Sequence, residues 1–143
     1  MAKTYGFGII PWSPLAGGLL TGKYDRAQTP PPDSRFATML KDFPHMVRRY
    51  ETDFFDVVDG LKPIASEKSC TLAQLSLAWC VQQPVVSSAI IGPRTMAQLE
   101  DNLGVMDVVI TDEDRSLIDA LVPPGRMVSP FYEADFGPHS YRV

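Results

Sequence analysis

The sequence predicts an α/β fold in which parallel strands alternate with helices. Two apolar runs rich in β-branched residues are typical of buried strands, and they occupy residues 7–12 and 85–91. Helical patterns lie between the two runs and continue after the second. Because a strand that is followed by a helix and another strand usually pairs in parallel, we expect a parallel sheet. Two strands alone make a poor sheet, since their outer edges lack partners.

The first elements predicted are a short helix and a strand. Residues 2–5 form the last turn of a helix, and Gly6 supplies the left-handed residue that ends it. The strand is expected to stop near Trp12, because Pro11 has no N–H group for a hydrogen bond within a sheet. The following loop therefore begins at the carboxyl end of this strand.

Residues 13–42 lack a regular apolar pattern and are predicted to form loops. Gly17 and Gly18 let the backbone of residues 13–24 turn tightly or approach a ligand closely. Residues 25–42 contain three consecutive prolines and few periodic apolar positions. We therefore expect an irregular surface excursion in this second part.

Two helices are predicted between the strands. Residues 50–68 repeat apolar side chains at helical spacing, and Pro63 is expected to kink or break this helix because it has no N–H group to donate. Thr71 and Gln74 form a capping-box pattern that starts the next helix, and Pro84 closes it. Both helices would supply apolar faces to the core.

Two more helices are predicted after the second strand. Thr95 and Gln98 form another capping-box pattern, and Thr111 is a candidate N-cap followed by three acidic residues, which are favourable at a helix start. The first helix has Met96, Leu99 and Leu103 on one face, and the second is expected to bury Leu117, Ile118, Leu121 and Val122. The tail, residues 126–143, contains aromatic side chains but little periodicity.

Composition excludes several classes of function. The chain has 143 residues, 45% hydrophobic and 21% charged, which is enough for one globular domain. The net charge of -4 argues against a nucleic-acid binder, and no apolar run is long enough for a membrane span or a signal peptide. We therefore expect a cytoplasmic protein that contacts neither nucleic acid nor membrane. Cys70 and Cys80 match no CxxC pair and are interpreted as buried free thiols.

Residues 17–24, GGLLTGKY, nearly match the phosphate loop of nucleoside triphosphatases. Tyr24 stands where that motif needs a serine or threonine hydroxyl for Mg²⁺, and no later strand ends in a suitable Asp. His45 and His139 are far apart and show no metal-ligand spacing, and Ser13 lacks the GxSxG context of a nucleophile. The residues therefore favour neither triphosphate hydrolysis, nor a metal site, nor a serine nucleophile.

The start of the helix after the second strand is the best local candidate for a binding site. Gly92 and Pro93 end the strand, Arg94 stands at the helix start and Thr95 caps it. Unpaired N–H groups and a partial positive charge at a helix N-terminus, together with a guanidinium group, attract phosphate. An ordinary capped surface helix explains the same residues, so both interpretations stay open at this point.

Three stretches together resemble the C-terminal part of the aldo-keto reductases. They are GIIPWSPLAGGLLTGKY with a later SRFA, QLSLAWCVQQP, and AIIGPRTMAQLEDNL. The resemblance implies the C-terminal part of a (β/α)8 TIM barrel, incomplete and mostly helical, in which residues 7–12 and 85–91 are strands seven and eight. It also implies NADPH as the cofactor of aldehyde and ketone reduction. Barrels of this kind often bind phosphate after strands seven and eight.

The resemblance assigns one group of cofactor contacts to the loop after the first strand. Trp12 matches the aromatic residue that stacks on the nicotinamide ring. Ser13, Leu15 and Gly17 match the loop around the pyrophosphate, where small residues let backbone N–H groups come close. This loop would cover one face of the ring and leave the other face to a carbonyl substrate.

A second group of contacts is assigned to the end of the second strand and the helix after it. Gly92 and Arg94 match the adenosine-phosphate site, and Arg94 would pair with the 2′-phosphate that distinguishes NADPH from NADH. Gln98 and Asn102 match positions near the adenine. The two groups are expected to form two walls of one dinucleotide groove.

The chain departs from the family because it lacks the catalytic set. The Asp, Tyr, Lys and His of the family belong to motifs in the first half of the barrel, and none of these motifs occurs here. The missing general acid alone is worth about 10²–10⁴-fold in rate. Residues 1–143 are therefore interpreted as a single truncated domain with a C-terminal tail at residues 126–143.

Two functions follow from this interpretation. The first is the NADP(H)-binding part of a reductase, which transfers hydride only when the missing N-terminal half completes it. The alternative is a non-catalytic interaction module, or an inactive fragment, that forms a homo-oligomer through its open strand edges. Potassium-channel beta subunits show that the family includes proteins that act as partners of other proteins.

Overall fold

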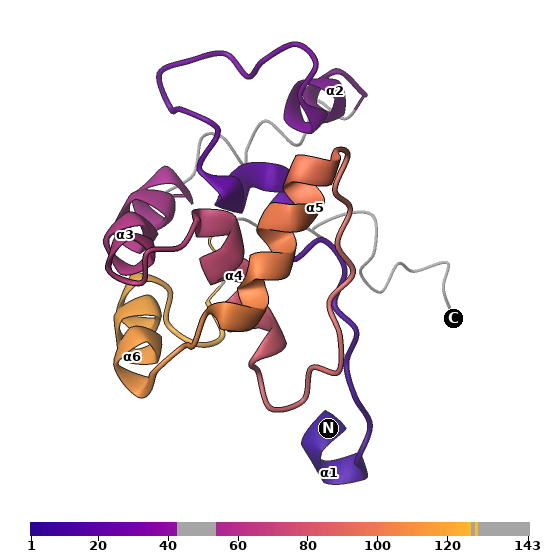
Figure 1. Cartoon of the computed structure of the whole chain (residues 1–143), viewed down its shortest axis with the longest axis vertical. Coiled ribbons are helices and arrows are strands. Elements are labelled where there is room, and N and C mark those ends of the chain that lie inside the picture. Colours follow the sequence, from indigo (N-terminus) through magenta and orange to yellow (C-terminus); the bar gives the residue numbers. More distant parts are fainter. Residues whose placement is uncertain (43–53, 127, 129–143) are drawn as a thin grey trace, which may run out of the picture.

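The computed structural model describes residues 1–42, 54–126 and 128, so His45, His139 and nearly all of the predicted tail lie outside the described residues. The described part is mostly helical (Figure 1), and within it no helix is both long and apolar enough to cross a membrane. Its helices are α1 (Ala2–Tyr5), η1 (Ala16–Thr21), α2 (Arg35–Asp42), α3 (Phe54–Glu67), α4 (Leu72–Val81), α5 (Met96–Leu103), η3 (Gly104–Asp107) and α6 (Asp112–Leu121).

The two predicted strands lie side by side and parallel, as two extended segments (Figure 1). They are joined by isolated bridges, one between Ile9 and Val86 and one between Trp12 and Ile90. The prediction of two regular strands is therefore wrong for the described residues, although the expected parallel pairing is confirmed. The second segment has one more residue between the bridges than the first, and this extra residue interrupts the ladder.

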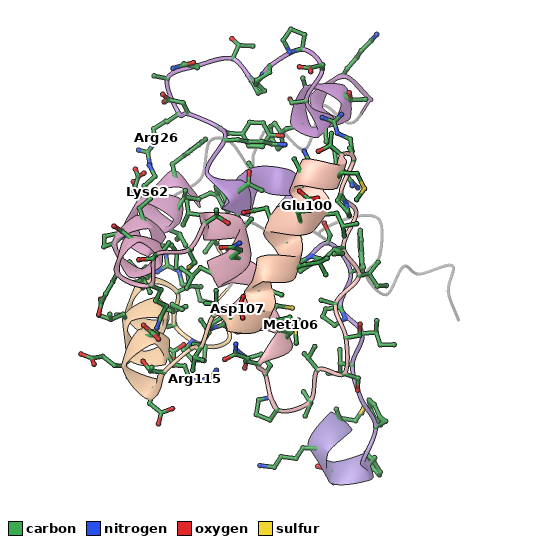
Figure 2. All side chains as sticks on the ribbon, viewed as in Figure 1. Arg26, Lys62, Glu100, Met106, Asp107 and Arg115 are labelled. Atoms are coloured by element: carbon green, nitrogen blue, oxygen red, sulfur yellow. The ribbon has the colours of Figure 1, made fainter. Side chains whose placement is uncertain are left out.

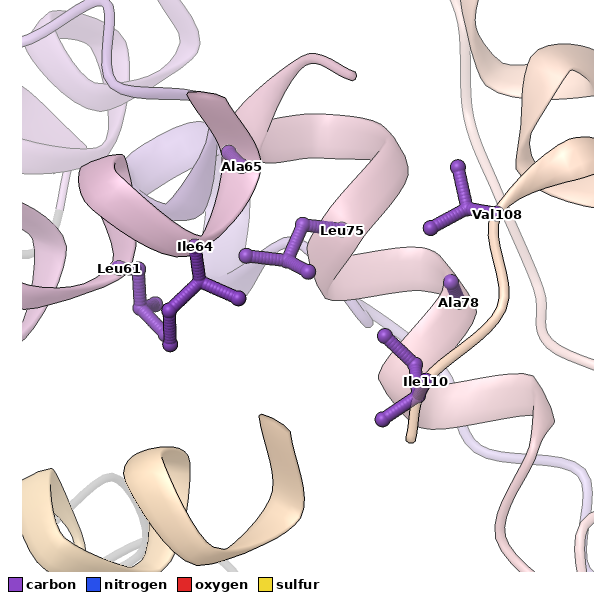
Figure 3. Close-up of a cluster of buried hydrophobic side chains, with 7 residues drawn as sticks. All are labelled: Leu61, Ile64, Ala65, Leu75, Ala78, Val108 and Ile110. Atoms are coloured by element: carbon purple, nitrogen blue, oxygen red, sulfur yellow. The ribbon is translucent and has the colours of Figure 1, made fainter. Parts of the chain in front are cut away.

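One apolar cluster fills the space between α3, α4 and the segment that precedes α6 (Figure 3). Its buried members are Leu61, Ile64, Ala65, Leu75, Ala78, Val108 and Ile110. Helix α6 packs closely on α3 beside Gly60, where an added Cβ would lie 2.5 Å from Cδ2 of Leu121. Glycine at this position is what allows the close approach of the two helices.

The side chain of Gln82 fixes the segment that leads into α6. Its Nε2 donates to the carbonyl of Val108 over 2.6 Å, and its Oε1 accepts from the N–H of Ile110 over 3.0 Å. An extended segment beside a helix has backbone groups that need partners, and one amide here satisfies two of them. Val108 and Ile110 are thereby held in the core.

A second apolar cluster joins η1, α2 and α3, with buried Leu19, Tyr24, Phe36, Phe54, Phe55 and Val58. The rings of Tyr24 and Phe36 lie 5.5 Å apart, and the Tyr24 hydroxyl accepts from the Phe36 N–H over 3.3 Å. The Oγ of Ser34 accepts from the Ala37 N–H and caps α2. The prediction of an irregular excursion over residues 25–42 is therefore wrong from residue 35, because Phe36 anchors a helix that the periodicity did not reveal.

Three helix starts follow the sequence prediction. Thr71, Thr95 and Thr111 are the N-caps of α4, α5 and α6, and each side-chain oxygen accepts a backbone N–H. At α6 the capping box is completed by Asp114, which also pairs with Lys68 of the loop after α3 over 2.6 Å. Burial by itself raises the pKa of Asp114, but hydrogen bonds from Lys68 and Thr111 outweigh burial and hold this pKa below its usual value.

The predicted break at Pro63 does not occur, because α3 runs from Phe54 to Glu67 without interruption. Pro63 is exposed, whereas Leu61, Ile64 and Ala65 beside it are buried in the core. Proline within a helix costs about 3 kcal/mol. Burial of the apolar side chains on both sides of the proline offsets that cost.

Two predicted helix faces do not match the observed burial. Met96 and Leu103 of α5 are exposed while Asn102 of the same helix is 7% exposed, and Leu117 of α6 is also exposed. In α5 the buried side chain is therefore a polar one. Cys70 and Cys80 are free thiols, as predicted, but both are only half-buried.

Candidate functional site

The loop after the first extended segment and the start of α5 border a cleft of about 590 Å³. The cleft is also bordered by the start of α4 and by Arg35 at the start of α2. All eight residues that the sequence analysis proposed as cofactor contacts line this cleft: Trp12, Ser13, Leu15, Gly17, Gly92, Arg94, Gln98 and Asn102. Two stretches far apart in the sequence thus meet in one site.

The backbone of the first wall is tightly coiled. Ser13 and Ala16 have positive φ values of 56° and 50°, and Gly17 and Gly18 follow with 72° and 97°. The Ala16 N–H donates to the Ser13 carbonyl over 2.8 Å, and the Thr21 hydroxyl donates to the Gly18 carbonyl over 2.7 Å. Positive φ is unfavourable for residues other than glycine, and such strain is concentrated at ligand sites. The loop therefore has the form of a preformed cradle.

The second wall is the capped start of α5. Gln98 N–H donates to Thr95 Oγ1 over 3.2 Å, and Gln98 Oε1 accepts from the N–H of Arg94 over 2.7 Å. The predicted capping box is thus displaced by one residue, because the Gln98 side chain reaches Arg94 rather than the cap itself. The exposed guanidinium of Arg94 donates to the Asp33 carbonyl over 3.2 Å. Gln98 and Asp33 together fix the position of Arg94.

A hydrogen-bonded group at the start of α4 holds α5 in place. Thr71 Oγ1 donates to Asp101 Oδ2 over 3.2 Å, and Gln74 Nε2 donates to the Asp101 carbonyl over 2.8 Å. A Cβ on Gly104 would collide with the Gln74 amide. Since Gln74 also completes the α4 capping box, the same side chain orders both helices that border the cleft.

Asn102 is a buried polar residue of the cleft. The residue is 7% exposed, and its side chain makes no hydrogen bond to any other group in the part of the chain that the structure describes. A buried polar group without a partner costs about 1–3 kcal/mol. The cleft therefore contains an amide that a polar ligand atom can satisfy.

The charge of the cleft is positive. Among its lining residues, all of them described, Lys23, Arg35 and Arg94 are cationic and Asp101 is the acidic member. Lys23 Nζ lies 5.0 Å from the ring centroid of Tyr24. These groups give the cleft the electrostatic character that an anion requires.

Sequence reasoning missed Lys23, Arg35, Thr71 and Asp101 as lining residues. The signal for the first two was available, because Lys23 and Arg35 belong to the stretches GIIPWSPLAGGLLTGKY and SRFA that carry the family resemblance. Thr71 and Asp101 have no local signal, because only the packing of α5 on α4 brings them to the cleft.

The two free cysteines of the described residues are separate from the cleft. Burial raises the pKa of Cys70 and that of Cys80, so both thiols stay protonated at neutral pH. Neither cysteine lines the cleft. The arrangement fits binding of an anionic, partly aromatic ligand, with Trp12 supplying a half-exposed ring at one end.

Comparison with curated proteins gives relatives from plants. The chain is 45% identical over 123 residues to a protein named probable voltage-gated potassium channel subunit beta from Oryza sativa subsp. japonica, and this match covers 84% of the chain and 37% of that relative. A protein of the same name from Arabidopsis thaliana is 45% identical over 106 residues, which are 73% of the chain and 31% of that relative. The chain thus spans about a third of the length of these relatives.

Comparison with solved structures supports the fold. The glycerol dehydrogenase of Gluconobacter oxydans superimposes with a TM-score of 0.69 at 23% sequence identity, over 93% of this chain and 40% of the dehydrogenase. The model of the aldo/keto reductase family matches residues 1–123, which contain both walls of the cleft. The chain therefore belongs to the aldo/keto reductase family.

Proposed function

We propose that this chain is the NADP(H)-binding part of an aldo-keto reductase, and that it supports hydride transfer to an aldehyde or ketone when the rest of the barrel is present. The observation that carries this proposal is the buried amide of Asn102, which has no partner among the described residues and lies in a cleft whose cations outnumber its acids. A nucleotide supplies both hydrogen-bonding atoms and phosphate charge. The family of the chain supports the same cofactor class.

The two walls fit different parts of the dinucleotide. Trp12 would stack on the nicotinamide, and the coiled backbone from Ser13 to Gly17 would surround the pyrophosphate. Arg94 would bind the 2′-phosphate, with Gln98 and Asn102 towards the adenine. In this arrangement the two extended segments are strands seven and eight of the barrel, whose carboxyl ends carry the phosphate site.

The residues of this chain would bind and orient the cofactor but not protonate the substrate. When bound, NADPH supplies the hydride. The aromatic ring of Trp12 would exclude water from one face of the nicotinamide, and Arg94 would hold the opposite end of the molecule. The proton for the carbonyl oxygen would come from the family's catalytic residues, whose motifs are absent from this sequence.

A fluorescence titration of the full chain with NADPH and with NADH tests the proposal. Arg94→Ala removes one charge-assisted hydrogen bond, worth about 1.5–3 kcal/mol, and the exposure of the guanidinium favours the lower end. We expect NADPH to bind about tenfold more weakly to this variant, with NADH nearly unaffected.

Arg26→Ala is the matched control. Arg26 is an exposed arginine that pairs with Asp56 of α3, and it lies away from α5 (Figure 2). Its removal should leave both affinities unchanged. Equal weakening of NADPH and NADH by Arg94→Ala, or binding that salt does not weaken, would show that Arg94 does not contact the 2′-phosphate.

The names of the two plant relatives favour a second candidate, a potassium-channel subunit that would bind the nucleotide without turning it over. Both candidates require the cleft to bind NADP(H). They separate in an assay of NADPH oxidation with a panel of aldehydes after the barrel has been completed. Turnover supports the reductase, whereas tight nucleotide binding without turnover supports the regulatory subunit.

A further inference from the structure

The carboxylate of Asp101 stands against the positive charge of the cleft. Asp101 lines the cleft together with three cationic side chains, and it forms no ion pair within the part of the chain that the structure describes. A carboxylate repels phosphate, so Asp101 lowers the affinity of the cleft for a simple anion. An ionised carboxylate has no proton to donate, so it can offset this repulsion only by accepting hydrogen bonds.

The hydroxyl group of Thr71 determines where one oxygen of this carboxylate lies. Thr71 Oγ1 accepts from the N–H of Gln74 over 3.1 Å, which is the bond that caps α4. The single proton of the hydroxyl is donated to Asp101 Oδ2 over 3.2 Å. The Asp101 carbonyl is held as well, because it accepts from Gln74 Nε2 over 2.8 Å. The start of α4 thus holds both the backbone and the side chain of Asp101.

The second carboxylate oxygen, Asp101 Oδ1, accepts no hydrogen bond from any group among the described residues. Asp101 is only partly buried, so a ligand in the cleft can reach this oxygen. Because Oδ2 is already held, less conformational freedom is lost when a ligand donor binds Oδ1. A ligand with O–H or N–H groups can use this acceptor, whereas a fully ionised phosphate group cannot.

We propose that Thr71 is a positioning residue for nucleotide binding: its hydroxyl holds Asp101 so that Oδ1 accepts a hydrogen bond from an O–H or N–H group of the nucleotide. This inference rests on the proposed NADP(H) site. The hydrogen bond offsets the repulsion between Asp101 and phosphate only for a ligand that has a donor. Asp101 therefore makes the cleft select a nucleotide over a polyanion without such donors.

Isothermal titration calorimetry of the full chain with NADPH and with inorganic pyrophosphate tests the proposal. Thr71→Gly removes the hydroxyl but leaves α4 well capped, because glycine is nearly as good an N-cap as threonine. We expect this variant to bind NADPH about fivefold more weakly, since it loses one well-placed hydrogen bond, and to bind pyrophosphate unchanged. Thr71→Ser keeps the hydroxyl and should bind both ligands as the unchanged chain does.

Thr111→Gly is the matched control for the loss of a capping hydroxyl. Thr111 caps α6 as Thr71 caps α4, and its hydroxyl also donates to an aspartate, Asp114 Oδ2, over 2.8 Å. Thr111 lies outside the cleft, so its replacement should lower the melting temperature and leave both affinities unchanged. If Thr111→Gly weakens NADPH binding as much as Thr71→Gly does, the effect comes from stability alone and the positioning role is wrong.

Asp101→Ala shows whether Thr71 acts through the carboxylate. This variant should bind NADPH about fivefold more weakly and pyrophosphate more tightly, because hydrogen bond and repulsion are lost together. When Asp101 is already replaced, Thr71→Gly should have no further effect on NADPH affinity. Glu100→Ala removes the neighbouring exposed carboxylate of α5, which does not line the cleft (Figure 2), and should leave both affinities nearly unchanged.

The results separate this inference from the proposed function. A Thr71→Gly effect that requires Asp101 supports the positioning role. An effect that persists without Asp101, or an Asp101→Ala variant that binds both ligands more tightly, overturns that role and leaves the NADP(H) site in place. Failure of the unchanged chain to bind NADPH would overturn both.

The hypoxanthine analogue of NADPH, in which an oxygen replaces the adenine amino group, identifies the donor. If Thr71→Gly weakens binding of the analogue as much as binding of NADPH, a ribose hydroxyl is the donor to Asp101. If only NADPH binding is weakened, the donor is the amino group. Either result supports the positioning role of Thr71.

Discussion

Replacing Asn102 by Leu should move stability and nucleotide affinity in opposite directions. Asn102 is 7% exposed and its amide has no partner among the described residues, so the folded chain carries the desolvation cost of these polar atoms. Leucine has a similar size and no polar atoms. The change therefore removes a cost to folding and, at the same time, removes a hydrogen-bonding group from the cleft.

The size of both effects follows from the burial. An unsatisfied buried polar group costs about 1–3 kcal/mol, and imperfect packing of the new side chain reduces the gain. We expect Asn102→Leu to raise the free energy of unfolding by about 1 kcal/mol. Loss of a neutral hydrogen bond worth about 1 kcal/mol should weaken NADPH binding about fivefold.

Urea denaturation and NADPH titration measure the two effects, and Gln82→Leu is the matched control. The Gln82 amide makes two hydrogen bonds, to the backbone of Val108 and Ile110, and lies outside the cleft. Its replacement should lower stability by about 2 kcal/mol because two backbone groups lose their partner. The reasoning is refuted if Asn102→Leu destabilises the chain as Gln82→Leu does, or leaves NADPH affinity unchanged.

Three further predictions concern contacts that join neighbouring helices. Because the folded-state pKa of Asp114 is lowered, its pairing with Lys68 stabilises the chain fully above about pH 4, and this contribution is lost as the pH falls through the lowered pKa. Asp114→Asn should therefore make the melting temperature depend less on pH in the acid range. An unchanged dependence would contradict the pairing. Gly60→Ala should lower the free energy of unfolding, measured in urea, by about 1 kcal/mol although alanine has the better helix propensity, because the new Cβ meets Leu121. A more stable variant would show that Leu121 moves freely. Gln74→Ala should lower the free energy of unfolding by about 1–2 kcal/mol, because α4 loses its cap and its hydrogen bond to α5. It should also weaken NADPH binding. Unchanged binding would show that Gln74 of α4 does not help to order the binding site.

The helix starts were predictable from the sequence because capping is a local interaction. Thr71 and Thr111 each find a partner within three residues, so spacing alone identifies the cap. The residues that the family motifs propose as cofactor contacts all line one cleft. Their contacts with a nucleotide remain predictions.

Burial was much less predictable than the elements themselves. Periodicity marks an apolar face but does not say whether a neighbour covers it, so Met96 and Leu103 were placed with the apolar residues although both are exposed. Pro63 was expected to kink or break α3, which is one continuous helix, because local rules contain no information on core packing. Helix α2 was not predicted, because the burial of its Phe36 depends on residues elsewhere in the chain.

The sequence by itself determined the family, the capped helices and the two segments that border the cleft, since these depend on local chemistry and on motifs. Only the tertiary structure decided that Arg94 is positioned by Gln98 and Asp33, and that Asn102 is buried with no side-chain partner among the described residues. These properties depend on how much surface distant parts of the chain cover, and no local pattern encodes that quantity.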